Sequence, residues 1–203
     1  MQRKWVAAAV GGCLVAGLGL YAGGFFDEEV GSFGVQDVCE SYGPDREVVA
    51  RLKQVLLKRS AYNFYGDSSL PAAGRTPISN YSSFCYVRDK DGALVSMVTR
   101  QMRGKDSDFW LNGGLIDHQI EEGVRFGRFK AGYAGVSSSG GAAIHLPCFK
   151  NHPEAMGSLS VSVALWQGSR AAPKETKAAA EFLVRRAAAF AHQDADCDLP
   201  SRL

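Results

Sequence analysis

The sequence predicts an α+β fold: an N-terminal transmembrane helix, then one antiparallel-sheet domain with two amphipathic helices packed on one face. Three observations lead to this prediction. Residues 5–26 carry no charge. Two segments, 44–59 and 173–192, repeat apolar residues at helical spacing. In residues 159–166, Leu and Val occupy every second position, as in a strand with one buried face. Because helices and strands must bury their apolar sides together, one layer of each is expected.

The uncharged segment has the length of a membrane-spanning helix. At about 1.5 Å per residue its 22 residues extend roughly 33 Å, enough to cross a hydrocarbon core of about 30 Å. Arg3 and Lys4 precede it and acidic residues follow it, so the N-terminus is expected in the cytoplasm. The expected organisation is a cytoplasmic start at 1–4, a transmembrane helix at 5–26, a linker at 27–38 and an extracytoplasmic domain at 39–203.

Two other interpretations of this segment remain open. A cleaved signal peptide would use the small residues 22–24 before Phe25, and the protein would then be secreted. A lipoprotein would use residues 10–12 before Cys13, which leaves a very short apolar region. The apolar run exceeds the roughly 7–15 residues of a signal-peptide core, which favours a retained anchor. All three interpretations place the domain outside the cytoplasm.

Two motifs fall inside the predicted span. Residues 17–22 fit a dinucleotide-binding fingerprint, but that motif requires a strand before it and a helix after it, so no cofactor is predicted. Gly19 and Gly23 form a GxxxG pair, through which two membrane helices can approach closely. In so Gly-rich a segment such a pair arises readily by chance, and a weak homodimer through it is an alternative only.

The charge balance argues against a nucleic-acid-binding surface. Of the 23 Lys and Arg residues, two precede the span, and the remaining 21 balance the 21 Asp and Glu residues. A domain with no net charge lacks the broad basic surface that nucleic acid requires.

The cysteines indicate an oxidising compartment. Cys39, Cys85, Cys148 and Cys197 lie beyond the span, an even number without CxxC spacing, so we expect two structural disulfides. Three pairings are possible. We favour Cys39–Cys85 and Cys148–Cys197, because each would tie an end of a predicted helix to a neighbouring strand. Each closes a loop long enough to contribute several kcal/mol in the chain-entropy model.

The remaining elements follow in chain order. After the first helix, residues 60–83 are rich in Gly, Ser and Pro and are expected to be a loop. Two hairpins are expected next, and residues 103–132 between them give no clear pattern. The strands of these hairpins are 84–88 with 93–102, and 132–137 with 142–148.

The densest group of titratable residues is Asp117, His118, Glu121 and Glu122. It would suit a metal or acid–base site, but a solvated helical turn is the simpler interpretation. His145 faces opposite to Ile144 and Leu146 and is expected to be a half-exposed sheet residue. His152 precedes a proline in a loop, and His192 ends the last helix.

Other candidates also favour structural roles. Ser137, Ser138 and Ser139 lack the GxSxG spacing of a nucleophile elbow and indicate a turn. Asp89 with Asp91, and Asp106 with Asp108, are expected in turns. Three aromatic residues could line a ligand groove but are more typical of a core or sheet face. They are Trp110, Tyr133 and Trp166. No catalytic, cofactor-binding or metal-ligating residue is predicted.

The layout as a whole resembles the membrane-anchored or secreted envelope proteins of unknown activity that are common in high-GC actinobacteria. The shared features are a short basic start, an Ala- and Gly-rich span, an acidic linker, and cysteines before a helix, in a strand, after Leu146-Pro147 and after the last helix. The resemblance implies an envelope location and no particular catalytic residue.

The expected function is a non-catalytic binding or interaction module of the cell envelope. The alternative is an envelope hydrolase or metal-dependent enzyme that uses Asp117, His118 and Glu121, or His145. Convergence of histidine and carboxylate side chains in a cleft would favour the enzyme.

Overall fold

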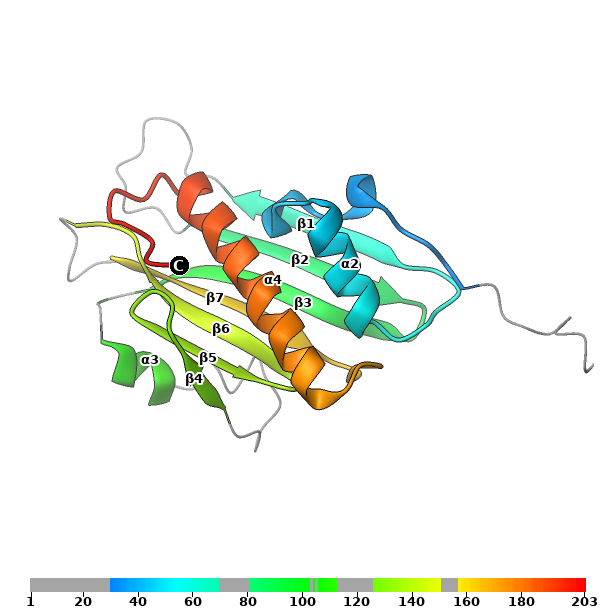
Figure 1. Cartoon of the computed structure of the whole chain (residues 1–203). Coiled ribbons are helices and arrows are strands. Elements are labelled where there is room, and N and C mark those ends of the chain that lie inside the picture. Colours follow the sequence, from blue (N-terminus) through cyan, green and yellow to red (C-terminus); the bar gives the residue numbers. More distant parts are fainter. Residues whose placement is uncertain (1–29, 70–80, 103, 105, 113–125, 151–156) are drawn as a thin grey trace, which may run out of the picture. The chain divides into compact units, whose positions relative to one another are not determined.

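In the described part of the chain, seven strands form one antiparallel sheet in the order β1-β2-β3-β7-β6-β5-β4 (Figure 1). The computed structural model describes residues 30–69, 81–102, 104, 106–112, 126–150 and 157–203. The strands are β1 (Asn63–Ser69), β2 (Ser82–Asp89), β3 (Gly92–Met102), β4 (Gly127–Phe129), β5 (Ala134–Ser138), β6 (Gly141–Pro147) and β7 (Ser158–Leu165). The helices are α2 (Arg46–Val55), α3 (Ser107–Asn112) and α4 (Pro173–Asp194), and the 3-10 turns are η1 (Val35–Asp37) and η2 (Glu40–Tyr42). The predicted α+β class with one antiparallel sheet is confirmed.

Two hairpins flank β7, the central strand of the sheet. β2 turns into β3 where the carboxylate of Asp89 accepts a hydrogen bond from the amide of Gly92 at 2.9 Å. β5 turns into β6 where the hydroxyl of Ser138 accepts one from the amide of Gly140 at 3.0 Å. β7 lies between β3 and β6 and pairs with both. Both predicted hairpins and the predicted strand at 159–166 are therefore present.

α2 and α4 lie over the same face of the sheet (Figure 1). Asp45 caps α2 by accepting a hydrogen bond from the amide of Val48 at 2.8 Å. Pro173 opens α4, where a missing amide proton costs nothing. α4 contacts β3, β5, β6 and β7 and also α2. Leu52 of α2 and Leu183 of α4 are buried in the main core, which therefore lies between these helices and the sheet.

One α-helix and two strands were not expected from the sequence. β1 lies within the segment expected to be a loop, so that expectation is wrong for Asn63–Ser69. Its Gly66-Asp67-Ser68-Ser69 run resembles a turn, but pairing with β2 along the whole strand holds it extended. α3 and β4 fall in the segment that gave no clear pattern.

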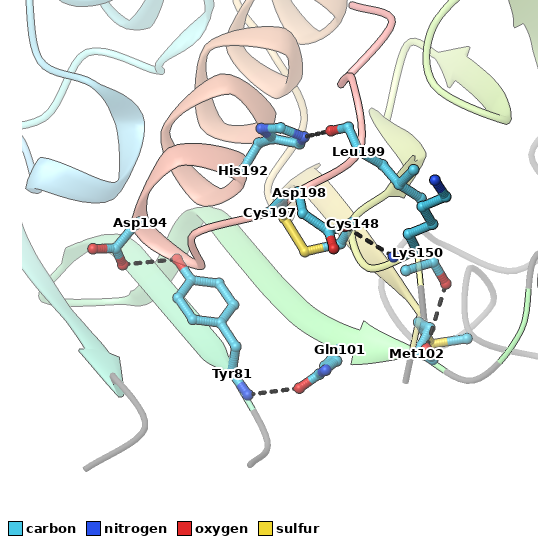
Figure 2. The surroundings of a disulfide bond; sticks show 11 residues. Tyr81, Gln101, Met102, Cys148, Lys150, His192, Asp194, Cys197, Asp198 and Leu199 are labelled. Carbon is cyan, nitrogen blue, oxygen red and sulfur yellow. Dashed lines mark hydrogen bonds between the residues drawn. A yellow bond between two sulfur atoms is a disulfide. The ribbon is translucent and has the colours of Figure 1, made fainter. Parts of the chain in front are cut away.

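Two disulfides fasten segments far apart in sequence. They join Cys39 to Cys85 and Cys148 to Cys197, the pairing that the sequence favours. Figure 2 shows how the second bridge holds the C-terminal tail beside the end of β6. The amide of Lys150 donates to the carboxylate of Asp198 at 2.8 Å. These contacts keep the end of α4 and the tail on the sheet.

The end of α4 is also tied to β2 and β3. The hydroxyl of Tyr81 donates to the carboxylate of Asp194 at 2.9 Å, and its amide donates to the side chain of Gln101 at 3.1 Å (Figure 2). Burial raises the pKa of Tyr81 well above its usual range, so the phenol stays protonated and remains a donor.

Residues 31–203 form one compact unit. None of its described helices is long and apolar enough to cross a membrane. The predicted span at 5–26, with Gly19 and Gly23, lies outside the described residues.

Candidate functional site

The sheet has a second face, opposite α2 and α4, and His145, Trp110 and Trp166 lie there. Along β7 the side chains of Leu159, Val161 and Val163 enter the main core. The alternating serines at 158, 160 and 162 therefore point to the second face. All of β7 is buried, so this face is covered at the centre of the sheet as well.

His145 lies on the second face and is 1% exposed. Its ring stacks on Trp110 of α3 with centroids 5.3 Å apart, and Tyr133 meets it edge-on at 5.3 Å. Strand alternation correctly places His145 opposite to Ile144 and Leu146, but the expected half-exposure is wrong. The reason is α3, which the sequence did not predict and which packs over the ring.

The hydrogen bonds of His145 define its tautomer. The single proton of the Ser158 hydroxyl is donated to the carbonyl oxygen of Gly104 at 2.7 Å. The Ser158 oxygen therefore accepts from Nε2–H of His145 at 2.9 Å. This leaves a lone pair on Nδ1, which faces the hydroxyl of Ser107 at 3.5 Å. The imidazole is thus held between two serines as a neutral ring.

Burial explains why the ring stays neutral. It lowers the pKa of His145 to about 4, and the nearby carboxylate of Asp106 opposes this shift without cancelling it. The indole of Trp110 is also satisfied, since its Nε1–H donates to the hydroxyl of Ser160 at 2.9 Å. Every polar atom discussed around this ring has a partner within the described residues, which is the pattern of a structural polar core.

Ser107 and His145 have the parts of a nucleophile and a general base, but the surroundings favour a structural role. A base whose pKa is about 4 is a weak proton acceptor at neutral pH. The first amides of α3, those of Asp108 and Phe109, already donate to the carboxylate of Asp106. Both amide donors are therefore used to cap the helix. This agrees with the expected position of Asp106 in a turn.

The other half of the second face carries exposed aromatic side chains. Phe64, Cys85 and Val87 pack in or against the main core, so their strand neighbours Tyr65, Phe84 and Tyr86 point the other way. The indole Nε1–H of Trp166 donates to the hydroxyl of Ser96, whose residue is directly opposite Tyr86 in the sheet. We call the four side chains of Tyr65, Phe84, Tyr86 and Trp166 the aromatic strip.

Three rings of the aromatic strip contact one another, and the strip is partly solvated. Ring centroids lie 5.6 Å apart for Tyr65 and Phe84, and 5.8 Å apart for Phe84 and Tyr86. Tyr65 is 61% exposed and Trp166 is 51% exposed. Of the three aromatics named from the sequence, only Trp166 belongs to it. Tyr65 is not predictable from the loop-like composition of residues 60–83, although adjacent Phe64 and Tyr65 are a strand signal.

The other predicted candidates are dispersed. Asp117, His118, Glu121 and Glu122, and also His152, lie outside the described residues. His192 donates from Nε2 to the carbonyl oxygen of Leu199 at 2.6 Å and so holds the C-terminal tail.

The serine and carboxylate candidates have structural partners. Ser137 is buried and donates to the carboxylate of Glu181 at 2.6 Å. Asp89 forms its hairpin turn and an ion pair with Arg59 at 2.5 Å. Among the described residues, no group of three or more His, Cys, Asp or Glu side chains could hold a metal ion.

Comparison with known proteins gives no match. No family model, no curated protein and no solved structure is similar to this chain. The function is therefore inferred from the arrangement of the residues themselves.

Proposed function

We propose that this protein is a non-catalytic binding module of the cell envelope, held at the membrane by residues 5–26. In this proposal the aromatic strip is the surface that contacts the partner. The observation that carries it is the exposure of Tyr65 and Trp166 beside half-buried Phe84 and Tyr86 on one sheet face.

The chemistry of the strip supports binding. Aromatic side chains offer large contact areas at low entropic cost and are enriched at the centres of interfaces. Exposed aromatics that lie next to one another mark interaction sites more often than single ones do. The same domain buries Trp110 completely and gives its indole N–H a hydrogen-bond partner. Exposure is therefore a property of the surface around Trp166 and is not shared by Trp110.

The location follows from the bridges. Two disulfides in one domain indicate an extracytoplasmic or secreted protein, since cytosolic thiols are kept reduced. The anchoring part of the proposal rests on the uncharged length of residues 5–26. Full-length protein is expected to stay with the membrane after alkaline extraction. Release into the supernatant would favour the secreted alternative.

Site-specific photo-crosslinking in intact cells tests the binding surface. A benzophenone amino acid replaces Tyr65 or Trp166 in the full-length protein, and Phe109 serves as the matched control. Phe109 is 62% exposed but belongs to α3, near the opposite edge of the sheet (Figure 1). We expect the same adduct from positions 65 and 166 and none from 109. No adduct at 65 and 166, or equal adducts at all three positions, would refute the proposal.

The alternative function is an envelope hydrolase. The contact between Ser107 and Nδ1 of His145 is the observation that favours it. A fluorophosphonate probe that labels the full-length protein at Ser107, and fails to label a His145→Gln variant, would establish this alternative. A metal-dependent enzyme built on Asp117, His118 and Glu121 would instead bind zinc, and a His118→Ala variant would lose that binding.

A weak homodimer through Gly19 and Gly23 is a further partner proposal. A Gly19→Leu substitution would prevent close approach of two membrane helices. Crosslinked dimers of the full-length protein in membranes should then decrease. Unchanged dimer yield would exclude this contact.

A further inference from the structure

β1 is the edge strand of the sheet. Within the described part of the chain it pairs with β2 alone, from Asn63↔Arg88 to Ser69↔Ser82. Among the described residues, no other backbone group donates to or accepts from residues 63–67. Tyr65, Gly66 and Asp67 are exposed. An edge of this kind can take one more strand from another chain.

A pocket of about 290 Å³ adjoins this edge. β1 contributes Phe64, Gly66 and Asp67, α4 contributes Phe190, and the remaining wall is the η1–η2 segment from Asp37 to Ser41. The Cys39–Cys85 bridge fixes that wall against β1 and β2. A Cβ atom on Gly66 would lie 2.7 Å from the sulfur of Cys39, so only glycine permits this close approach.

The lining of the pocket is acidic. Asp37, Glu40 and Asp67 line it with exposed carboxylates, and no described lining residue is basic. Three carboxylates without a cation favour a positively charged occupant. Phe64 and Phe190 supply aromatic surface, to which cationic groups are also attracted.

A buried hydroxyl adds a second observation. Ser41 lines the same pocket, is 4% exposed, and its Oγ has no hydrogen-bond partner within the described part of the chain. A buried polar atom without a partner is rare in folded proteins and calls for an explanation. A bound donor that reaches Ser41 after a small adjustment of this wall would satisfy it.

We infer that the edge of β1 and the adjoining pocket bind an extended, basic segment of a protein partner. The segment pairs with β1 as an eighth strand, and one of its Lys or Arg side chains enters the pocket among Asp37, Glu40 and Asp67. This inference rests on the proposed binding function and names the chemistry of the partner. Backbone pairing supplies affinity, and the acidic pocket supplies selectivity for a cation.

Binding of designed peptides to the full-length protein in detergent micelles tests the inference. The probe is a fluorescent, end-blocked seven-residue peptide of alternating Lys and Val. One control peptide has Glu in place of Lys, and a second carries N-methyl groups that remove alternate backbone donors. Anisotropy reports affinity, and amide chemical shifts locate the contact. We expect only the Lys peptide to bind, with shifts at residues 63–67.

Matched charge variants separate the pocket from general electrostatics. The combined Asp37→Asn, Glu40→Gln and Asp67→Asn variant should weaken binding about tenfold or more, as expected for losing a close charge pair. The control removes the same charge from three other exposed acidic side chains and should change affinity less than about threefold. The control variant combines Asp91→Asn, Asp108→Asn and Glu175→Gln.

An equal loss of peptide affinity in both charge variants would overturn the inference, and so would equal binding of the Glu peptide or the N-methylated peptide. Amide chemical-shift changes confined to another surface, or binding only of a second copy of this chain, would also overturn it. If no peptide binds but adducts form at positions 65 and 166, the binding of a basic segment at β1 is refuted and the proposed binding function is retained. Absence of both would refute the two together.

Discussion

At the scale of single residues, His145 separates what a sequence pattern can predict from what it cannot. Alternation along a strand assigns the face on which His145 lies, because successive side chains point to opposite sides. It does not say what covers that face. The covering residue is Trp110, from a short helix whose six residues carry no helical repeat long enough to recognise.

We predict that His145 makes the domain less stable in mild acid. Its pKa in the folded state is about 4, below the value of about 6.5 expected when unfolded, so the unfolded state binds the proton more readily. The neutral ring therefore makes its full contribution to the free energy of unfolding above about pH 6.5, and this contribution is lost as the pH falls toward 4. Wild type should lose about 3 kcal/mol more than a His145→Gln variant between pH 7 and pH 4.

Urea unfolding of both proteins at a series of pH values measures this difference. The carboxylates are common to both proteins, so the difference between the two curves reports the histidine. Parallel curves would mean that His145 accepts a proton as readily in the folded state as in the unfolded state, and that burial does not lower its pKa.

At the scale of elements, the helices and hairpins were predictable because each carries a local signal. Pro173 and the apolar repeat after it predict α4, and Asp89 with Gly92 predicts the first hairpin. β1 was not predicted, because its turn-like Gly66–Ser69 run outweighs the short strand signal of Phe64 and Tyr65, and pairing with β2 decides the outcome. The aromatic strip was hidden for the same reason, because Tyr65 belongs to that strand.

We predict that α2 depends on its N-terminal cap. Asp45 accepts the amide of Val48 and also forms an ion pair with Arg186 of α4. An Asp45→Ala variant should lose about 1–2 kcal/mol of unfolding free energy. An Asp45→Asn variant keeps the capping oxygen and loses only the half-exposed ion pair, so it should lose less than about 1 kcal/mol. Equal losses in urea unfolding would show that the ion pair, rather than the cap, is the main contribution.

At the scale of the whole molecule, the disulfides join segments that the sheet alone does not hold. One ties η2 to β2 and the other ties the tail after α4 to the end of β6. The even number of cysteines predicted two bridges, and their position beside predicted helix ends favoured this pairing. The activity could not be predicted in the same way, because binding depends on which side chains remain exposed after folding.

We predict that removing the second bridge costs much of the stability of the domain. Cys148 and Cys197 close a loop with a sequence separation of 49, and the chain-entropy model gives about 4 kcal/mol for such a loop. Domains are typically stable by about 5–15 kcal/mol. A Cys148→Ala and Cys197→Ala double variant should therefore unfold at markedly lower urea concentration. A change below about 1 kcal/mol would mean that the hydrogen bonds of the tail suffice.

The two disulfides indicate that this domain folds in an oxidising space outside the cytoplasm. Peptide mapping under non-reducing conditions, on full-length protein alkylated in intact cells before extraction, measures the state of the four cysteines. We predict linked peptides for Cys39 with Cys85 and for Cys148 with Cys197, and no alkylation at these four positions. Alkylated free thiols at these positions in protein from intact cells would contradict the claim.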